Sequence, residues 1–195
     1  MGAVRHLNPI RSGIFWGEIA PTEHMCQIYG DDSTFMDALE GFVGSGLRAG
    51  ESVIVIATAG HLHTLEQRLR GNWLDLDRAR WEDRYIALLA SETLNRFMVE
   101  GWPDETLFRR AVSEIIKRAR GDGRKVRAFG EMVALLWAQG HAGATVRLEH
   151  LWNRFQAEEH FPLFCAYPRA GFTQDASASI RTICSTHSKI IPGSV

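Results

Sequence analysis

The sequence predicts an α/β domain with three layers, in which a mainly parallel sheet is flanked by helices. Strand-like and helix-like segments alternate along most of the 195 residues, which is typical of right-handed crossovers between parallel strands. The segment Ser52–Thr58 contains five consecutive apolar residues, four of them β-branched, as expected for a strand that is buried on both faces. The hydrophobic fraction of 45% and the charged fraction of 23% fit an ordinary globular domain.

The first half of the chain contains three strand segments and two helix segments. His24–Tyr29 has the pattern of a short strand, and the turn at 30–33 ends it, with Asp32 or Ser33 as the expected N-cap of the next helix. Apolar residues recur at three- and four-residue steps, which predicts amphipathic helices over 35–47 and 61–69. The second and third strands are expected over 52–58 and 83–90.

The second half of the chain repeats the alternation. Pro103 is expected to begin a long helix that reaches about Ala119. A fourth strand follows over 126–129, and a helix begins after Glu131. The remaining segments are a helix over 144–158, a fifth strand over 161–167 and a last helix over 176–188.

Residues 1–21 are expected to form an N-terminal arm that docks through Phe15 and Trp16, and residues 22–190 to form a single domain. The arm has no signal-peptide pattern, the three cysteines are few, and the longest apolar run is too short to cross a membrane. We therefore expect a cytoplasmic protein with reduced thiols.

Charge argues against a nucleic-acid or membrane partner. The net charge is −1, whereas proteins that coat anionic polymers or membranes carry a positive excess. The basic stretch between Arg109 and Arg127 is diluted by acidic residues, and we interpret it as a solvated helix face and turn.

The turn Tyr29–Thr34 lacks the chemistry of a phosphate-binding loop. It has one glycine, no lysine and two aspartates, and carboxylates repel a triphosphate. The chain contains no Gly-x-x-x-x-Gly-Lys, no dinucleotide fingerprint, no nucleophile elbow and no His-Glu-x-x-His. No catalytic residue and no cofactor are therefore predicted.

Ligands of parallel α/β folds bind beyond the carboxyl ends of the strands, where Tyr29, Glu131 and Tyr167 are expected. Glu131 follows the fourth strand, with Arg127 four residues earlier and Gly130 between them. Glu131 and Arg127 are candidates for binding a polar ligand. The alternative for Glu131 is stabilisation by the dipole of the helix that it precedes.

His24 and Cys26 are two residues apart on a strand and therefore face the same side. With Cys165 on another strand, they are candidates for a zinc site or a reactive thiol site, with His187 as a candidate fourth ligand. The spacing matches no known zinc signature, and free cysteine commonly packs as a small hydrophobe. We therefore predict no metal, and His24 and Cys165 stay candidate ligand-binding residues.

Three further polar residues are secondary candidates. His61 lies at the start of a predicted helix, where it serves either as a capping residue or in a pocket. Glu149 and Asn153 are four residues apart and share a helix face. They contact either a ligand or a buried backbone group.

Five short motifs follow one another along the chain: His24-x-Cys26-x-x-Tyr29, Gly50-Glu51 before the Val53–Ile56 strand, Arg127-x-Phe129-Gly130-Glu131-Met132, Leu148-Glu149-x-x-Trp152-Asn153 and Phe164-Cys165-x-Tyr167. Their order and spacing resemble the MEDS sensory domain, the methanogen/methylotroph sensory domain that also occurs in a dichloromethane-responsive regulator. The resemblance covers roughly residues 22 to 188. It implies a degenerate KaiC/RecA-like core without a phosphate loop.

The resemblance further implies a signal-input domain of prokaryotic signal transduction or transcriptional regulation, which senses a small hydrocarbon derivative without catalysis. The expected partners are a small organic ligand, a separate regulatory protein or kinase, and a second copy of the chain as a homodimer, with no direct nucleic acid and no membrane. The expected ligand-binding residues are His24, Tyr29, Arg127, Glu131, Cys165 and Tyr167, with Cys26, His61, Glu149 and Asn153 as a secondary set.

Three alternatives remain at this point. The chain is a residual nucleotide-binding protein, a partner-switching interaction module, or a thiol or metal sensor that uses Cys26 and Cys165.

Overall fold

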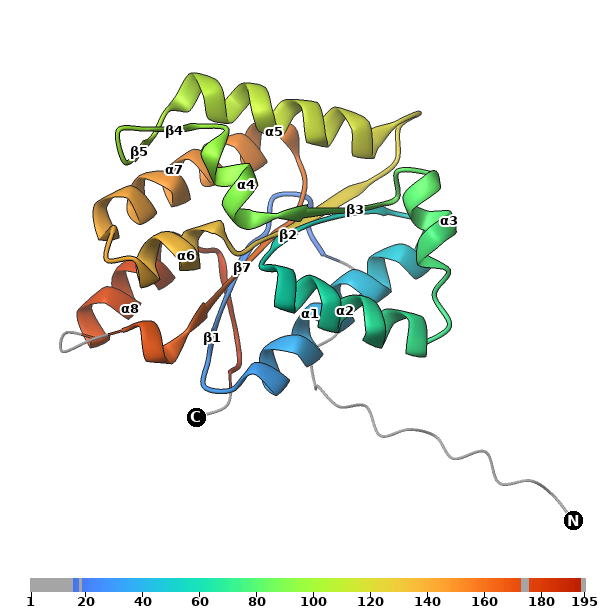
Figure 1. Cartoon of the computed structure of the whole chain (residues 1–195), viewed down its shortest axis with the longest axis horizontal. Helices are drawn as coiled ribbons and strands as arrows, with labels where there is room; N and C mark the ends of the chain where they lie inside the picture. The colour runs from blue at the N-terminus through green and yellow to red at the C-terminus, as the bar shows by residue number, and fades with distance from the viewer. Residues whose placement is uncertain (1–15, 18, 173–175, 194–195) are drawn as a thin grey trace, which may run out of the picture.

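The computed structural model describes residues 16–17, 19–172 and 176–193. Within this part of the chain, six strands form one sheet in the order β3-β2-β6-β7-β1-β8 (Figure 1). Every neighbouring pair in this sheet is parallel, so the predicted parallel sheet is confirmed. The strands are β1 (His24–Tyr29), β2 (Ser52–Ala57), β3 (Tyr85–Leu89), β6 (Val126–Gly130), β7 (Leu163–Pro168) and β8 (Lys189–Ile191).

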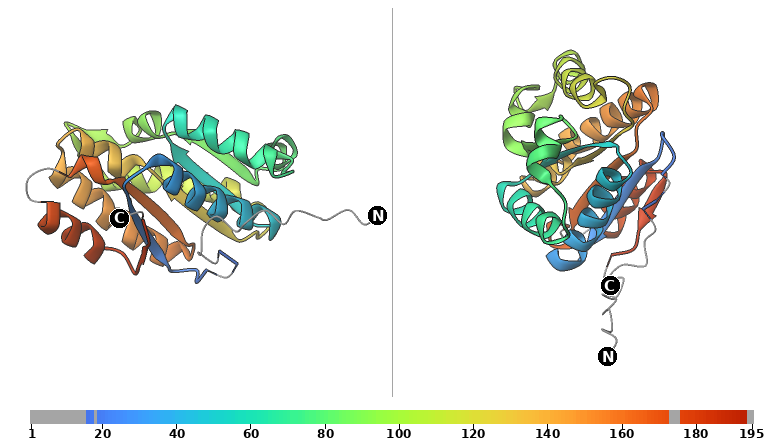
Figure 2. Two further views of the ribbon diagram at one scale, coloured as in Figure 1. Left: turned by 90° about the horizontal axis from the view of Figure 1, so that it is seen from below. Right: turned by 90° about the vertical axis from the view of Figure 1, so that its right-hand side faces the viewer.

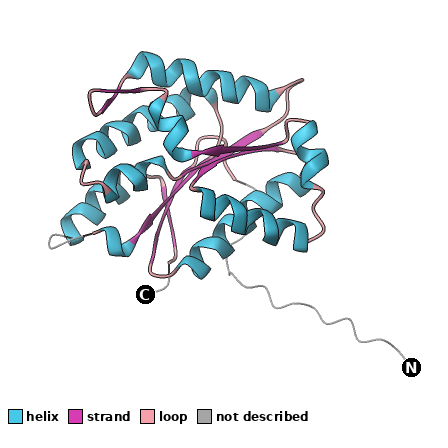
Figure 3. Cartoon of the chain, in the orientation of Figure 1, coloured by secondary structure: helices cyan, strands magenta, loops and turns pink. Residues whose placement is uncertain are grey.

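Helices cover both faces of this sheet, which confirms the three-layer α/β fold (Figures 2 and 3). One face packs against α1 (Asp32–Arg48), α2 (Ala59–Gly71) and α3 (Leu76–Trp81). The other face packs against α4 (Ala90–Asn95), α5 (Glu105–Arg120), α6 (Met132–Ala138), α7 (Ala142–Glu159) and α8 (Ala176–Ser185). Each face has its own apolar core, so the sheet is buried on both sides.

The N-terminus of α1 shows how the turn after β1 is used. The backbone N–H of Thr34 donates to Asp31 Oδ1 over 2.9 Å, and Asp31 has extended backbone angles, so Asp31 is the N-cap. The expectation of Asp32 or Ser33 as the cap was wrong, because the helix already begins at Asp32. The first aspartate of the turn therefore has a structural role.

Gly46 lets α1 approach the sheet closely. A Cβ atom at this position would lie 2.7 Å from Arg127 Nε and 2.9 Å from Val53 Cγ2. We expect Gly46→Ala to lower the free energy of unfolding by about 1–3 kcal/mol, because overpacking outweighs the better helix propensity of alanine. Urea unfolding measures this change. Gly71→Ala is the matched control, since a Cβ there meets open space; equal effects at both positions would contradict the prediction.

Several short elements depart from the predicted order. The helices α3 and α4 and the antiparallel pair β4 (Met98–Val99) and β5 (Trp102–Pro103) were not predicted. Pro103 does not begin α5, because it pairs with Met98 and Asp104 supplies the N-cap instead. The last helix ends at Ser185, and β8 follows at the edge of the sheet.

The described end of the N-terminal arm docks on the α1 face through Trp16. Its ring is buried and lies 5.5 Å from Phe42 and 5.7 Å from Phe164, centroid to centroid. Phe15, the other predicted docking residue, lies outside the described residues. None of the helices in the described ranges has the length and apolarity needed to cross a bilayer.

Candidate functional site

The sheet has a topological switch point between β2 and β6. The two strands pair in parallel, but α2, which follows β2, packs on one face and α6, which follows β6, packs on the other. Ligands of open parallel sheets bind where adjacent crossovers leave to opposite faces. The side chains at the carboxyl ends of β1, β2 and β6 are therefore candidates for a ligand-binding site.

Glu131 connects the end of β6 with the start of α2. Its Oε2 accepts a hydrogen bond from the backbone N–H of Thr58 over 2.8 Å, and its Oε1 lies 2.8 Å from His61 Nδ1. The Glu131 side chain is 7% exposed and that of His61 is 20% exposed. This hydrogen bond and the carboxylate charge raise the pKa of His61 above its usual value of 6.5, against the opposing effect of burial.

Tyr29, at the end of β1, reaches the same place through an aromatic contact. Its ring stacks on Phe35 at 4.7 Å, and Phe35 meets the His61 ring edge-on at 5.0 Å. Burial, followed by the negative charges of Glu131 and Asp32, raises the pKa of Tyr29. The structure thus brings together three predicted site residues, Tyr29, His61 and Glu131. We call these three residues and Thr58 the β2–β6 switch point.

We expect the His61–Glu131 pair to contribute less to stability as the pH rises. The pKa of His61 is raised in the folded chain, so the charged pair is complete below the unfolded value near 6.5 and is lost as the pH passes the folded value. At the lowest pH of a series, the free energy of unfolding of wild type should exceed that of His61→Gln by about 1 kcal/mol or less. This difference should shrink towards alkaline pH in urea unfolding series. A difference that widens with pH contradicts this expectation.

Arg127 does not join this site. It lies near the amino end of β6, four residues and about 13 Å of strand from Glu131. Its guanidinium contacts Glu51 at 2.5 Å and donates to the Phe42 carbonyl at 3.0 Å, beneath α1. The expectation that Arg127 and Glu131 act together is therefore wrong. Arg127 instead holds α1, through the Phe42 carbonyl, and the loop between α1 and β2, through Glu51, against the sheet.

A cavity of about 760 Å³ lies at this opposite end of the sheet, beside the described part of the N-terminal arm. Its charged lining residues are Glu51, Arg120, Arg124, Lys125, Arg127 and Glu159, and His160 lines it as well. Several of these charges are already paired, since Arg120 contacts Glu159 at 2.6 Å and Arg127 contacts Glu51. Arg109 and Arg118, from the same basic stretch, also form ion pairs, with Glu158 and Asp83 respectively.

A second group of predicted residues lies on the opposite face of the sheet. His24 and Cys26 belong to the α7 side of β1, whereas Tyr29 belongs to the α1 side. Strand side chains alternate between faces, so residues five positions apart point in opposite directions. The single predicted site is thus divided in two.

His24 is held in one orientation by Asn153. Its Nδ1 lies 2.6 Å from Asn153 Oδ1, while Asn153 Nδ2 donates to the Thr186 carbonyl over 2.7 Å. The amide is thereby oriented so that Nδ1 of His24 carries the proton and donates. Burial, and next the nearby His187, lower the pKa of His24 to about 3, so the ring is neutral. Its Nε2 accepts a hydrogen bond from the Cys165 thiol, whose Sγ lies 3.4 Å away.

Glu149 lies at the centre of this group. It is 1% exposed and accepts a hydrogen bond at Oε1 from the hydroxyl of Tyr167. Burial raises the pKa values of Glu149, Cys165 and Tyr167, the last two also through the charge of Glu149. The predicted shared face of Glu149 and Asn153 on α7 is confirmed, because both reach His24 or its neighbours.

Four side chains here are arranged as a metal could require, and we call them the His–Cys–Glu cluster: His24, Glu149, Cys165 and His187. Cys26 is not a member, although it pairs in register with Cys165 and burial raises the pKa of its thiol. The sequence identified His187 only as a candidate fourth ligand and Thr58 only as the end of the second strand. Nothing in the periodicity of the chain marks either residue, since both lie between elements.

The fold and the two groups of residues define a parallel α/β domain with polar side chains gathered at strand ends and beneath one helix layer. The family model described as MEDS, the methanogen/methylotroph and DcmR sensory domain, matches residues 23–188. The chain therefore belongs to the MEDS family of sensory domains. A search of curated proteins found no match.

Proposed function

We propose that the chain is a non-catalytic sensory domain that binds a small organic molecule at the β2–β6 switch point. The observation that carries the proposal is the position of Glu131, whose carboxylate joins the end of β6 to the first turn of α2. Membership of a sensory family supports the sensory role. A ligand that reaches this carboxylate acts on two elements from opposite faces of the sheet.

The side chains at the switch point favour a small hydrocarbon derivative with one polar group. Tyr29 and Phe35 provide stacked, mostly apolar rings, and His61 and Glu131 provide a donor and an acceptor beside them. Small-molecule sites typically combine an apolar wall with a few polar groups of this kind. An alcohol, an aldehyde or a halocarbon of a few carbons fits this description.

Binding produces a signal only if the ligand has different affinities for two states of the protein. In our proposal, the two states differ in whether His61 or the ligand contacts Oε1 of Glu131. Loss of the His61 contact loosens the first turn of α2, which the Thr58 side chain caps through the His61 N–H. The output then passes to a separate regulatory protein or kinase, or to a second copy of the chain, in prokaryotic cytoplasmic signalling or transcriptional regulation.

The proposal treats the domain as a degenerate KaiC/RecA-like core. The turn after β1 supports this view, because it offers Asp31 and Asp32 where a phosphate loop would supply backbone amides and a lysine. Asp31 is also engaged as the cap of α1. A triphosphate placed here would meet negative charge.

The test is the thermal midpoint of the full chain with a panel of short alcohols, aldehydes and halocarbons, and with MgATP in parallel. A ligand at 100 times its dissociation constant stabilises by about 2.7 kcal/mol, which raises the midpoint of a domain of this size by roughly 5–11 °C. We expect a response to at least one organic compound. The same compound should shift Glu131→Gln and Tyr29→Phe less than wild type, each measured from its own baseline.

Glu92→Gln is the matched control, because Glu92 is exposed on α4. It should respond as wild type does. A shift with MgATP alone would favour the nucleotide-binding alternative. Silence across the panel would favour the partner-switching module, and an equal response in Glu131→Gln would move the ligand away from the switch point.

A further inference from the structure

Four donor atoms from distant parts of the chain converge inside the molecule. They come from His24 on β1, Glu149 on α7, Cys165 on β7 and His187 after α8, and all lie within 4.8 Å of one another. The side chains of His24, Glu149 and His187 are at most 1% exposed, and Cys165 is fully buried. Two imidazoles, a thiol and a carboxyl group are rarely buried side by side unless they have a common function, since each is costly to bury.

Both imidazoles turn the same atom inward. His24 donates from Nδ1 to Asn153 Oδ1, and His187 donates from Nδ1 to the Ile183 carbonyl over 2.7 Å. Each ring is therefore the tautomer whose Nε2 carries a lone pair. Histidines that bind metals show this arrangement, in which the outer N–H is fixed by a carbonyl and the other nitrogen is free for the ion.

Two atoms of the cluster are left without hydrogen bonds. Among the buried side chains of the described residues, Glu149 Oε2 and His187 Nε2 have no partner within hydrogen-bonding geometry. Tyr167 satisfies only Oε1 of Glu149. Buried polar atoms are nearly always paired, so each unpaired atom needs an explanation, and here both belong to the same four-residue cluster.

Three spacings between ligand atoms of the cluster are close to the edge lengths of a small tetrahedron. His24 Nε2 lies 3.4 Å from Cys165 Sγ and 3.6 Å from Glu149 Oε2, and His187 Nε2 lies 3.5 Å from Glu149 Oε1. Metal–ligand bonds of about 2.0–2.3 Å arranged tetrahedrally give edges of about 3.3–3.8 Å. An ion at the centre would satisfy the two unpaired atoms together.

We propose that His24, Glu149, Cys165 and His187 bind one Zn²⁺ ion. Two nitrogens, one sulfur and one oxygen suit zinc, whereas Mg²⁺ and Ca²⁺ prefer oxygen alone. On binding, the Cys165 thiol releases its proton to solvent and its sulfur becomes a ligand as the thiolate. All four positions are filled by protein, as in a structural site, so the ion joins the segment between α8 and β8 to the sheet. This inference is independent of the proposed sensory function.

The first test uses the full chain without a histidine tag. After dialysis against metal-free buffer, elemental analysis should find about one zinc per chain. A chelator should then yield a metal-depleted chain that binds one equivalent of Zn²⁺ or Co²⁺, and the Co²⁺ form should show the intense visible bands of tetrahedral thiolate ligation. A depleted wild-type chain that shows no saturable binding of either ion at neutral pH overturns the proposal.

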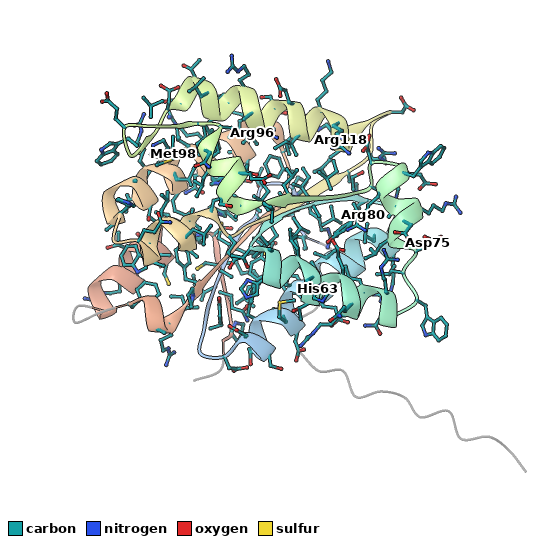
Figure 4. The ribbon with its side chains drawn as sticks, in the orientation of Figure 1. His63, Asp75, Arg80, Arg96, Met98 and Arg118 are labelled. Atoms are coloured by element: carbon teal, nitrogen blue, oxygen red, sulfur yellow. The ribbon has the colours of Figure 1, made fainter. Side chains whose placement is uncertain are left out.

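The second test compares variants by competition with a chromophoric chelator. Cys165→Ser and His187→Gln should lose at least 100-fold in zinc affinity. Asn153→Ala, which removes the hydrogen-bond partner of His24 and of the Thr186 carbonyl but none of the four ligands, should lose about 10–100-fold. The controls are Cys184→Ser, which changes a cysteine outside the cluster, and His63→Gln, on α2 in the other helix layer (Figure 4). Both should bind zinc as wild type does. Wild-type affinity in Cys165→Ser and His187→Gln overturns the proposal, and if these variants fail to fold, the Co²⁺ spectrum of the wild-type chain decides it.

Discussion

Arg127→Ala is expected to lower the free energy of unfolding by about 3–5 kcal/mol, the usual cost of removing one partner from a buried ion pair. The guanidinium is 1% exposed and contacts Glu51, the Phe42 carbonyl and the Ser45 hydroxyl. It also lies over the Phe42 ring, at 5.3 Å from the centroid. Truncation leaves the Glu51 carboxylate without its guanidinium partner, removes one of the donors to the Phe42 carbonyl and opens a cavity beneath α1.

Equilibrium urea unfolding measures this loss. Arg118→Ala is the control, because Arg118 also pairs with a carboxylate, that of Asp83, but its side chain is 55% exposed (Figure 4). Its loss should stay below about 1 kcal/mol. If the two variants lose the same amount, the buried network contributes no more than a surface ion pair, and our account of Arg127 is wrong.

Phe164→Ala is expected to cost about 3–5 kcal/mol, in the range found for truncating buried aromatic residues. Phe164 lies on β7, inside the sheet, and is fully buried. Its ring meets those of Trp16, Phe42 and Phe129 at centroid distances of 5.7, 5.5 and 5.3 Å. The substitution therefore removes contacts to the N-terminal arm, to α1 and to β6 together.

The thermal midpoint gives a convenient measurement. A loss of this size should lower the midpoint by roughly 6–20 °C in a domain of about 200 residues. Trp81→Ala, which removes an aromatic side chain that is 86% exposed, should change stability by no more than about 0.5 kcal/mol. A Phe164→Ala midpoint within a degree or two of wild type would contradict the packing described for the α1 face.

The long elements of the fold were predictable because each has a pattern of its own. The β-branched run of β2 and the apolar stripe of α5 are visible without any partner. The three-residue strand β8 has no such pattern, since only pairing with β1, from the other end of the chain, makes it a strand. The short pair β4 and β5 is likewise defined by its partner, which is why Pro103 was assigned to a helix.

The candidate site was predictable in its residue types and not in its grouping. Tyr29, His61 and Glu131 follow strands, and the rule that ligands bind at carboxyl ends locates them. The sequence could have separated Arg127 from the Glu131 site, because the two ends of a five-residue strand are farther apart than one side chain can reach. His187 could not be found with certainty, because only the return of the chain after α8 brings it to His24.

The position of β1 in the sheet has a consequence for how the chain assembles. β1 pairs with β7 on one side and with β8 on the other, so Cys26 meets Cys165 and Ile190. During synthesis, β1 leaves the ribosome long before β7 and β8, the two strands that pair with it. Contacts of such long sequence separation slow folding and expose unpaired strand edges meanwhile. The earliest strand of the sheet is thus one of the last to be completed.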